Sequence, residues 1–102
     1  MDTPYGLTFG QALEFLKAGH QVAREGWNGK GMWIMLVPGT QPRITPESPY
    51  GKVLGEYANT DDGCVDQVRI ESHIDMFTAA GDMQPGWLAS QADMLGEDWG
   101  VV

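Results

Sequence analysis

The sequence predicts a single α+β domain, residues 1–102, in which a small antiparallel sheet packs on one N-terminal helix. Three observations predict this class. One amphipathic, well-capped helical segment lies near the N-terminus, and several short apolar segments separated by Gly and Pro follow it. The third is size: 102 residues, 42% of them apolar, suffice for one hydrophobic core and leave little room for a second.

The helix is the strongest local signal. Thr8 and Gln11 have the spacing of a capping box, in which each side chain accepts from a free backbone N–H at the helix start. Apolar residues then follow at i, i+3, i+4 and i+7, namely Phe9, Ala12, Leu13 and Leu16. Gly19 lies just beyond and is typical of a helix end. The pattern predicts a helix over Phe9–Ala18.

Two strands are expected next, joined by a glycine-rich turn. Gln21–Glu25 follows the helix and suits a short strand, and Met32–Val37 is an apolar run. Because Met32–Val37 shows no polar alternation, we expect it to be buried on both faces. The turn between them, Gly26–Gly31, contains Asn28-Gly29, a strong hairpin signal.

The middle of the chain has a weaker pattern. Three prolines interrupt Thr40–Asn59, so a loop of about 20 residues is expected there, and loops of this length are commonly functional. Val65–Glu71 alternates imperfectly between apolar and polar residues and His73–Phe77 continues it, which predicts further strands. Cys64 is interpreted as a partly buried small side chain.

The C-terminal part predicts a turn, a short helix and a last strand. Ala80–Asp82 forms the turn, after which Met83–Gln84 pairs back. Ser90–Asp93 is a possible second capping arrangement that opens one helical turn through Leu95. Trp99–Val102 is expected to close the sheet.

The charge balance excludes several classes of partner. Lys+Arg 6 against Asp+Glu 14 gives a net charge of −8, whereas a DNA- or RNA-backbone binder needs many cations. An anionic membrane surface also requires basic clusters. One cysteine cannot form an intrachain disulfide, and no leader or membrane span is recognisable, so we expect a cytoplasmic protein without nucleic-acid or membrane partners.

Catalytic and metal-binding patterns are not diagnostic. The serines lie in no nucleophile motif, and no P-loop or dinucleotide fingerprint is present. His73 and Asp75 share one strand face as residues i and i+2, but a metal would need a further convergent ligand. His20, after the helix stop, is interpreted as complementing the helix C-terminus. We therefore predict no catalytic residue, no metal site and no cofactor.

The placement of two tryptophans points to nucleotide binding. Trp27 lies in the glycine-rich turn beside Asn28 and Lys30, and Trp87 follows Pro85-Gly86 at another chain reversal. Aromatic faces beside polar groups suit a nucleobase, whose stacking contributes ~1–3 kcal/mol. An equally weighted alternative is that both tryptophans simply cover the small core or an oligomer interface.

These stretches also resemble a known family. Phe9–Leu13 and Val22–Met32 look like the N-terminal signature of the second family of Thoeris anti-defence proteins, which occurs in phages and prophages. His73–Met76 and especially Trp87–Trp99 are similar to its C-terminal signature. Order and spacing agree along the chain except over Gln41–Val68, the variable segment.

The resemblance implies a sponge that binds nucleotide immune signals in the host bacterial cytoplasm and does not degrade them. The signals are cyclic ADP-ribose isomers made by TIR-domain enzymes, and relatives are also associated with cyclic dinucleotides of CBASS systems. The implied assembly is a homotetramer with pockets shared between protomers. The implied ligand contacts are stacking by Trp27 and Trp87, and polar contacts from Arg24, Asn28, Lys30, Ser90, Gln91 and Asp93.

Two other functions stay open at this point. One is an enzyme that cleaves the same signals with His73, Asp75 or Asp93. The other is a decoy that binds a host defence protein through its acidic surface.

Overall fold

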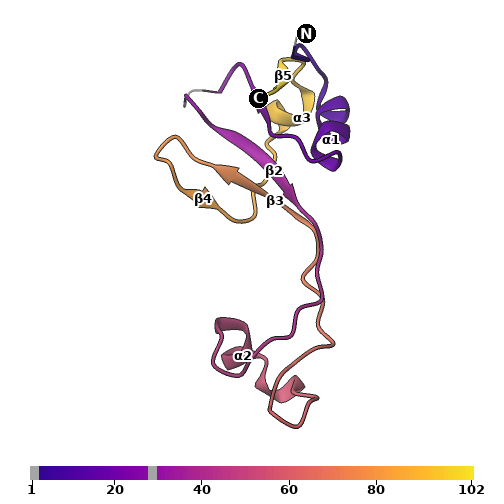
Figure 1. Cartoon of the computed structure of the whole chain (residues 1–102). Coiled ribbons are helices and arrows are strands. Elements are labelled where there is room, and N and C mark those ends of the chain that lie inside the picture. The colour runs from indigo at the N-terminus through magenta and orange to yellow at the C-terminus, as the bar shows by residue number, and fades with distance from the viewer. Residues whose placement is uncertain (1–2, 28–29) are drawn as a thin grey trace. The chain divides into compact units, whose positions relative to one another are not determined.

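The computed structural model describes residues 3–27 and 30–102, which form an antiparallel five-stranded sheet with short helices (Figure 1). The elements in chain order are α1 (Phe9–Lys17), β1 (Val22–Arg24), β2 (Trp33–Val37), α2 (Pro49–Val53), the 3-10 helix η1 (Gly55–Tyr57), β3 (His73–Phe77), β4 (Met83–Gln84), α3 (Gln91–Leu95) and β5 (Trp99–Val101). The strand order is β4-β3-β2-β1-β5. The predicted α+β class, with its N-terminal helix, C-terminal helical turn and closing strand, is confirmed.

The chain divides into two compact units. The sheet unit comprises Met1–Val37 with His73–Val102, and the inserted unit comprises Pro38–Ser72. Every predicted site residue that the structure describes belongs to the sheet unit. None of the helices in the described ranges is long and apolar enough to cross a membrane.

Helix α1 begins and ends as its sequence predicts. Thr8 Oγ1 accepts from the backbone N–H of Gln11 (3.2 Å), and Gln11 Oε1 accepts from that of Thr8 (2.9 Å), so the capping box is formed. Ala18 caps the C-terminus, and Gly19 follows with a φ of +96°, a conformation that favours glycine. The helix therefore presents a fixed apolar stripe to the sheet.

That stripe forms the core together with one face of the sheet. The buried cluster consists of Ala12 and Leu16 from α1 with Val22, Ile34 and Trp99 from β1, β2 and β5. Val22 pairs with Ile34 and Arg24 pairs with Trp99, and paired residues point to the same side of a sheet. Arg24 is thereby placed on the same face as the core, beside Trp99.

The other face of β2 is not buried, which corrects the sequence prediction. Of the strand's five residues only Ile34 is buried, and the others are half-buried. Trp33 and Phe77, paired across β2 and β3, stack with ring centroids 5.0 Å apart and planes 10° apart. Neither belongs to the core cluster or to the side chains packed against it. An apolar run does not distinguish a strand covered on both faces from one covered on a single face.

The inserted unit differs more from its prediction. Part of the expected loop folds as α2, whose N-cap Ser48 accepts from Gly51 N–H at 3.0 Å and whose first residue is Pro49. The strand expected over residues 65–71, all of which are described, does not form. Its ends make single bridges instead, Ile44 with Val65 and Thr40 with Ile70.

Cys64, which the sequence predicts to be partly buried, is buried in the inserted unit. Burial raises the pKa of its thiol, so a smaller fraction of Cys64 is in the reactive thiolate form at neutral pH.

Replacing Gly51 by alanine is expected to destabilise the inserted unit by about 1–3 kcal/mol, because overpacking against backbone cannot be relieved locally. Gly51 is buried, and a Cβ there would collide with the carbonyl oxygen of Thr45. Hydrogen exchange over residues 38–72 should show lost protection. The matched control is Gly55→Ala, since a Cβ on Gly55 meets nothing within 4 Å. Equal protection in both variants would contradict this packing.

Candidate functional site

Asp93 lies at the centre of the predicted site residues. It follows Ser90, the N-cap of α3, whose Oγ accepts from Asp93 N–H (3.0 Å). In return Asp93 Oδ2 accepts from Ser90 N–H (3.0 Å). The capping arrangement predicted from the sequence is confirmed, and it fixes the Asp93 carboxylate at the start of the helix.

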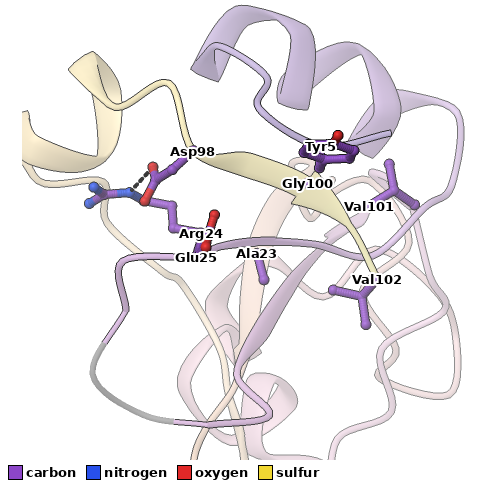
Figure 2. Close-up of a pocket in the computed structure, with 8 residues that line it drawn as sticks. All are labelled: Tyr5, Ala23, Arg24, Glu25, Asp98, Gly100, Val101 and Val102. Atoms are coloured by element: carbon purple, nitrogen blue, oxygen red, sulfur yellow. Dashed lines mark hydrogen bonds and ion pairs between the residues drawn. The ribbon is translucent and has the colours of Figure 1, made fainter. Parts of the chain in front are cut away.

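The other carboxylate oxygen of Asp93 joins α3 to the segment at the end of β1. Asp93 Oδ1 accepts from Arg24 Nη1 (2.9 Å) and from the indole Nε1 of Trp27 (3.0 Å). Arg24 Nε donates to Asp98 Oδ1 (2.9 Å), and Figure 2 shows these two side chains facing each other. Asp98 Oδ2 in turn accepts from Gly26 N–H (2.7 Å). We call Arg24, Trp27, Asp93 and Asp98 the Arg24 network. It anchors the start of the β1–β2 connection to the C-terminal segment.

The network keeps its acids ionised. Burial alone would raise the pKa of Asp93, but hydrogen bonds from the Ser90 backbone, Trp27 and Arg24 outweigh it and lower the pKa to about 2. The hydrogen bond from Arg24 likewise lowers the pKa of Asp98, and the two carboxylates raise the pKa of Arg24. Both acids are therefore ionised throughout the neutral range and serve as fixed acceptors.

Trp27 and Trp87 join an aromatic cluster around the buried Trp99. Their ring centroids lie 5.3 and 6.2 Å from that of Trp99, and 6.2 Å from each other, in edge-to-face arrangements. Phe9 completes the cluster from α1. Both tryptophans are half-buried and pack against the core, so each has a structural role besides any contact with a ligand.

The predicted site residues fall into two groups. The structure brings Arg24, Trp27, Trp87, Ser90 and Asp93 together through the contacts above. Lys30 and Gln91 are exposed, Lys30 before β2 and Gln91 in the first turn of α3. Asn28, also predicted to contact a ligand, lies outside the described residues.

Two shallow pockets flank Arg24 in the sheet unit. The Tyr5 pocket, of about 340 Å³, is drawn in Figure 2, where Tyr5 lies beside Gly100 of β5 and Glu25 lies beside Arg24 at the end of β1. The Lys30 pocket, of about 350 Å³, is lined by residues that include Arg24, Trp27, Lys30, Met32, Trp33 and Val102. The Lys30 pocket thus gathers three of the predicted ligand residues, Arg24, Trp27 and Lys30.

Sequence reasoning missed two residues of this region. Asp98 has no local signal, because its partner Arg24 is 74 positions away. The apolar run Met32–Val37 predicts a buried Trp33, yet Trp33 lines the Lys30 pocket. The glycine-rich turn that carries Lys30 ends two residues before Trp33, and this nearness is the one sequence signal for a pocket edge.

The His73–Asp75 pair forms on one strand, as its spacing predicts, with His73 Nε2 3.5 Å from Asp75 Oδ1. Asp75 Oδ1 also accepts from Gly86 N–H at 2.9 Å, which ties β3 to the turn before Trp87. Across residues 3–27 and 30–102, no group of three or more His, Cys, Asp or Glu is arranged to hold a metal ion.

Comparisons with known proteins agree with the sequence motifs. Residues 7–102 match the family model of the Thoeris anti-defense 2-like domain. A curated relative, "Thoeris anti-defense 2" of Bacillus phage SP01, is 36% identical over 96 residues, which cover 94% of each chain. The match spans the variable segment as well as both signatures. The chain therefore belongs to the Thoeris anti-defense 2-like family, which indicates a phage anti-defence role.

Proposed function

We propose that the protein acts in the host cytoplasm by binding cyclic nucleotide immune signals and holding them intact. The expected ligands are cyclic ADP-ribose isomers made by TIR-domain enzymes, with CBASS cyclic dinucleotides as a second class to be tested. The observation that carries this proposal is the Lys30 pocket, where indole rings and cationic side chains meet in a family member.

The chemistry of this pocket fits a nucleotide. An indole surface offers stacking to a base, and the exposed Lys30 ammonium offers charge to a phosphate. Arg24 is committed to Asp93 and Asp98, so its contribution is mainly to hold the pocket wall. A local cation in a chain of net charge −8 admits a small anionic ligand while long polyanions are repelled.

The size of the pocket supports a shared site. Ligand pockets commonly measure about 300–1,000 Å³, and the Lys30 pocket, at about 350 Å³, is near the lower end of that range. A cyclic nucleotide with two phosphates and more than one ribose needs a larger contact surface than the pocket of one chain supplies. We therefore propose that a second protomer completes the site, in a homotetramer.

Holding a ligand requires no general acid or base, and the geometry favours this over cleavage by Asp93. Its carboxylate accepts three hydrogen bonds and has a pKa of about 2, so it cannot supply a proton at neutral pH. The test is a titration of a cyclic ADP-ribose isomer with substoichiometric protein, followed by chromatography. The concentration of unbound signal should fall in proportion to the amount of protein added and should then stay constant with time. Continued loss, with or without sensitivity to a chelator, would instead indicate an enzyme.

A decoy predicts a different result. Pull-down of a host defence protein without any nucleotide would favour it over sequestration.

Trp27→Ala and Trp87→Ala are each expected to abolish binding of a cyclic ADP-ribose isomer and leave assembly intact, because Trp27 lines the Lys30 pocket and Trp87 packs edge-to-face against Trp27. Isothermal titration measures the first effect and size-exclusion chromatography the second. Leu88→Ala is the control, since Leu88 is next to Trp87 and 90% exposed. Wild-type affinity in both tryptophan variants would refute the stacking roles.

A further inference from the structure

Trp33 is held in a fixed orientation on the sheet face opposite α1. It is the first residue of β2, where side chains alternate between faces, and the next residue, Ile34, points into the core. Phe77 of β3 covers one side of the indole, with nearly parallel planes 10° apart and centroids separated by 5.0 Å. The side chain is half-buried and outside the core cluster.

Trp33 also differs from Trp27 in what its ring already contacts. The Trp27 indole donates its N–H to Asp93 and packs edge-to-face against Trp99 at 5.3 Å, so much of it belongs to the core. Among the described residues Trp33 has one stacked aromatic neighbour, Phe77, and it lines the Lys30 pocket together with Lys30 and Met32. A flat ring supported from behind and open to a pocket is a preorganised platform for a base.

We propose that Trp33 stacks on the purine base of the bound signal, while Lys30, three residues earlier, contacts a phosphate of the same ligand. This rests on the proposed function and adds a residue and an orientation to it. The base lies over β2 on the open face of the sheet, and the phosphate lies toward the β1–β2 connection. Trp33 is thus a ligand-binding residue that the sequence alone assigned to the core.

The alternative is that Trp33 only covers apolar surface, either of the sheet or of an adjoining copy of the chain. Substitutions can distinguish the two roles because stacking needs a π-face and covering needs only apolar volume. Trp33→Phe keeps a flat ring on Phe77, whereas Trp33→Leu keeps apolar volume and removes the ring. Met35→Ala is the matched control, since Met35 is half-buried on the same strand and the same face but does not line the pocket.

The probe is a cyclic ADP-ribose isomer, titrated into each variant by calorimetry with circular dichroism and size-exclusion chromatography as checks of fold and assembly. Trp33→Leu should weaken binding at least about tenfold, Trp33→Phe should stay within about threefold, and Met35→Ala should match wild type. Lys30→Gln should weaken binding and reduce its dependence on salt. If Trp33→Leu does not fold, Trp33→Met, which also lacks a π-face, replaces it.

Two results would overturn the assignment of Trp33 to base stacking. One is wild-type affinity in Trp33→Leu. The other is loss of assembly together with binding in that variant, which would place Trp33 at an interface between copies. Failure of the proposed function has a different signature, namely a wild-type protein that binds neither cyclic ADP-ribose isomers nor cyclic dinucleotides.

Discussion

Replacing Asp93 by alanine is expected to destabilise the protein by roughly 3–5 kcal/mol, the usual cost of breaking a buried ion pair from one side. The Asp93 side chain is only 11% exposed, and its loss leaves Arg24 Nη1, Trp27 Nε1 and Ser90 N–H without their acceptor. For a domain of this size the thermal midpoint should fall by more than about 10 °C. Thermal unfolding followed by circular dichroism measures the change.

Asp82→Ala serves as the control for Asp93. Asp82 is exposed, and substitutions of exposed side chains without special contacts usually change stability by less than about 0.5 kcal/mol. Equal effects of the two substitutions would show that the Arg24 network does not stabilise the fold.

The same carboxylate should make the wild-type stability depend on pH. The pKa of Asp93 falls from 3.8 to about 2 on folding. The contribution of its carboxylate to the free energy of unfolding is therefore complete above about pH 4 and is lost as the pH falls through about 2. The shift corresponds to roughly 2 kcal/mol, and Asp98 contributes in the same direction. Urea unfolding between pH 5 and 2 should show a steeper loss in wild type than in Asp93→Ala.

Trp99→Ala is expected to cost about 3–5 kcal/mol, as is typical of a large buried aromatic residue. Trp99 is fully buried at 0% exposure and is the common neighbour of Phe9, Trp27 and Trp87. Its removal should also disorder the aromatic cluster. The near-ultraviolet circular dichroism signal should therefore be lost, and the urea concentration at the midpoint of unfolding should fall.

Two variants separate the contributions of Trp99. Trp99→Phe keeps much of the ring but removes the indole donor to the Asp93 carbonyl (2.9 Å), which should cost about 1–3 kcal/mol. Leu95→Ala, at a 79% exposed position on α3, should be nearly neutral. If Trp99→Ala were as stable as Leu95→Ala, Trp99 could not be the centre of the core.

Local signals predicted the sheet unit well. The Thr8–Gln11 capping box and the Gly19 stop define α1 because both ends depend on residues within a few positions. Ser48-Pro49 carries an equally local signal, an N-cap followed by proline at the first helical position, yet the surrounding prolines favoured a loop. Proline both interrupts regular structure and favours the first turn of a helix, and at Pro49 the second effect decides the fold.

The site was only partly predictable because its geometry is not local. The spacing of Ser90 and Asp93 predicts their cap, but that spacing carries no information about Arg24, which is 69 positions away. The apolar run around Trp33 predicts burial on both faces, because such a run does not reveal that α1 covers one face of β2 alone. The partners of a side chain across a sheet follow from register, and register follows from the folded chain.

The most direct test of sequestration is recovery of the ligand. A cyclic ADP-ribose isomer is mixed with excess protein, unbound material is removed, the protein is denatured by heat, and the released small molecules are identified by mass spectrometry. We expect intact signal, in the amount captured, that still activates the host effector. Release of a linearised or hydrolysed product would contradict the proposal.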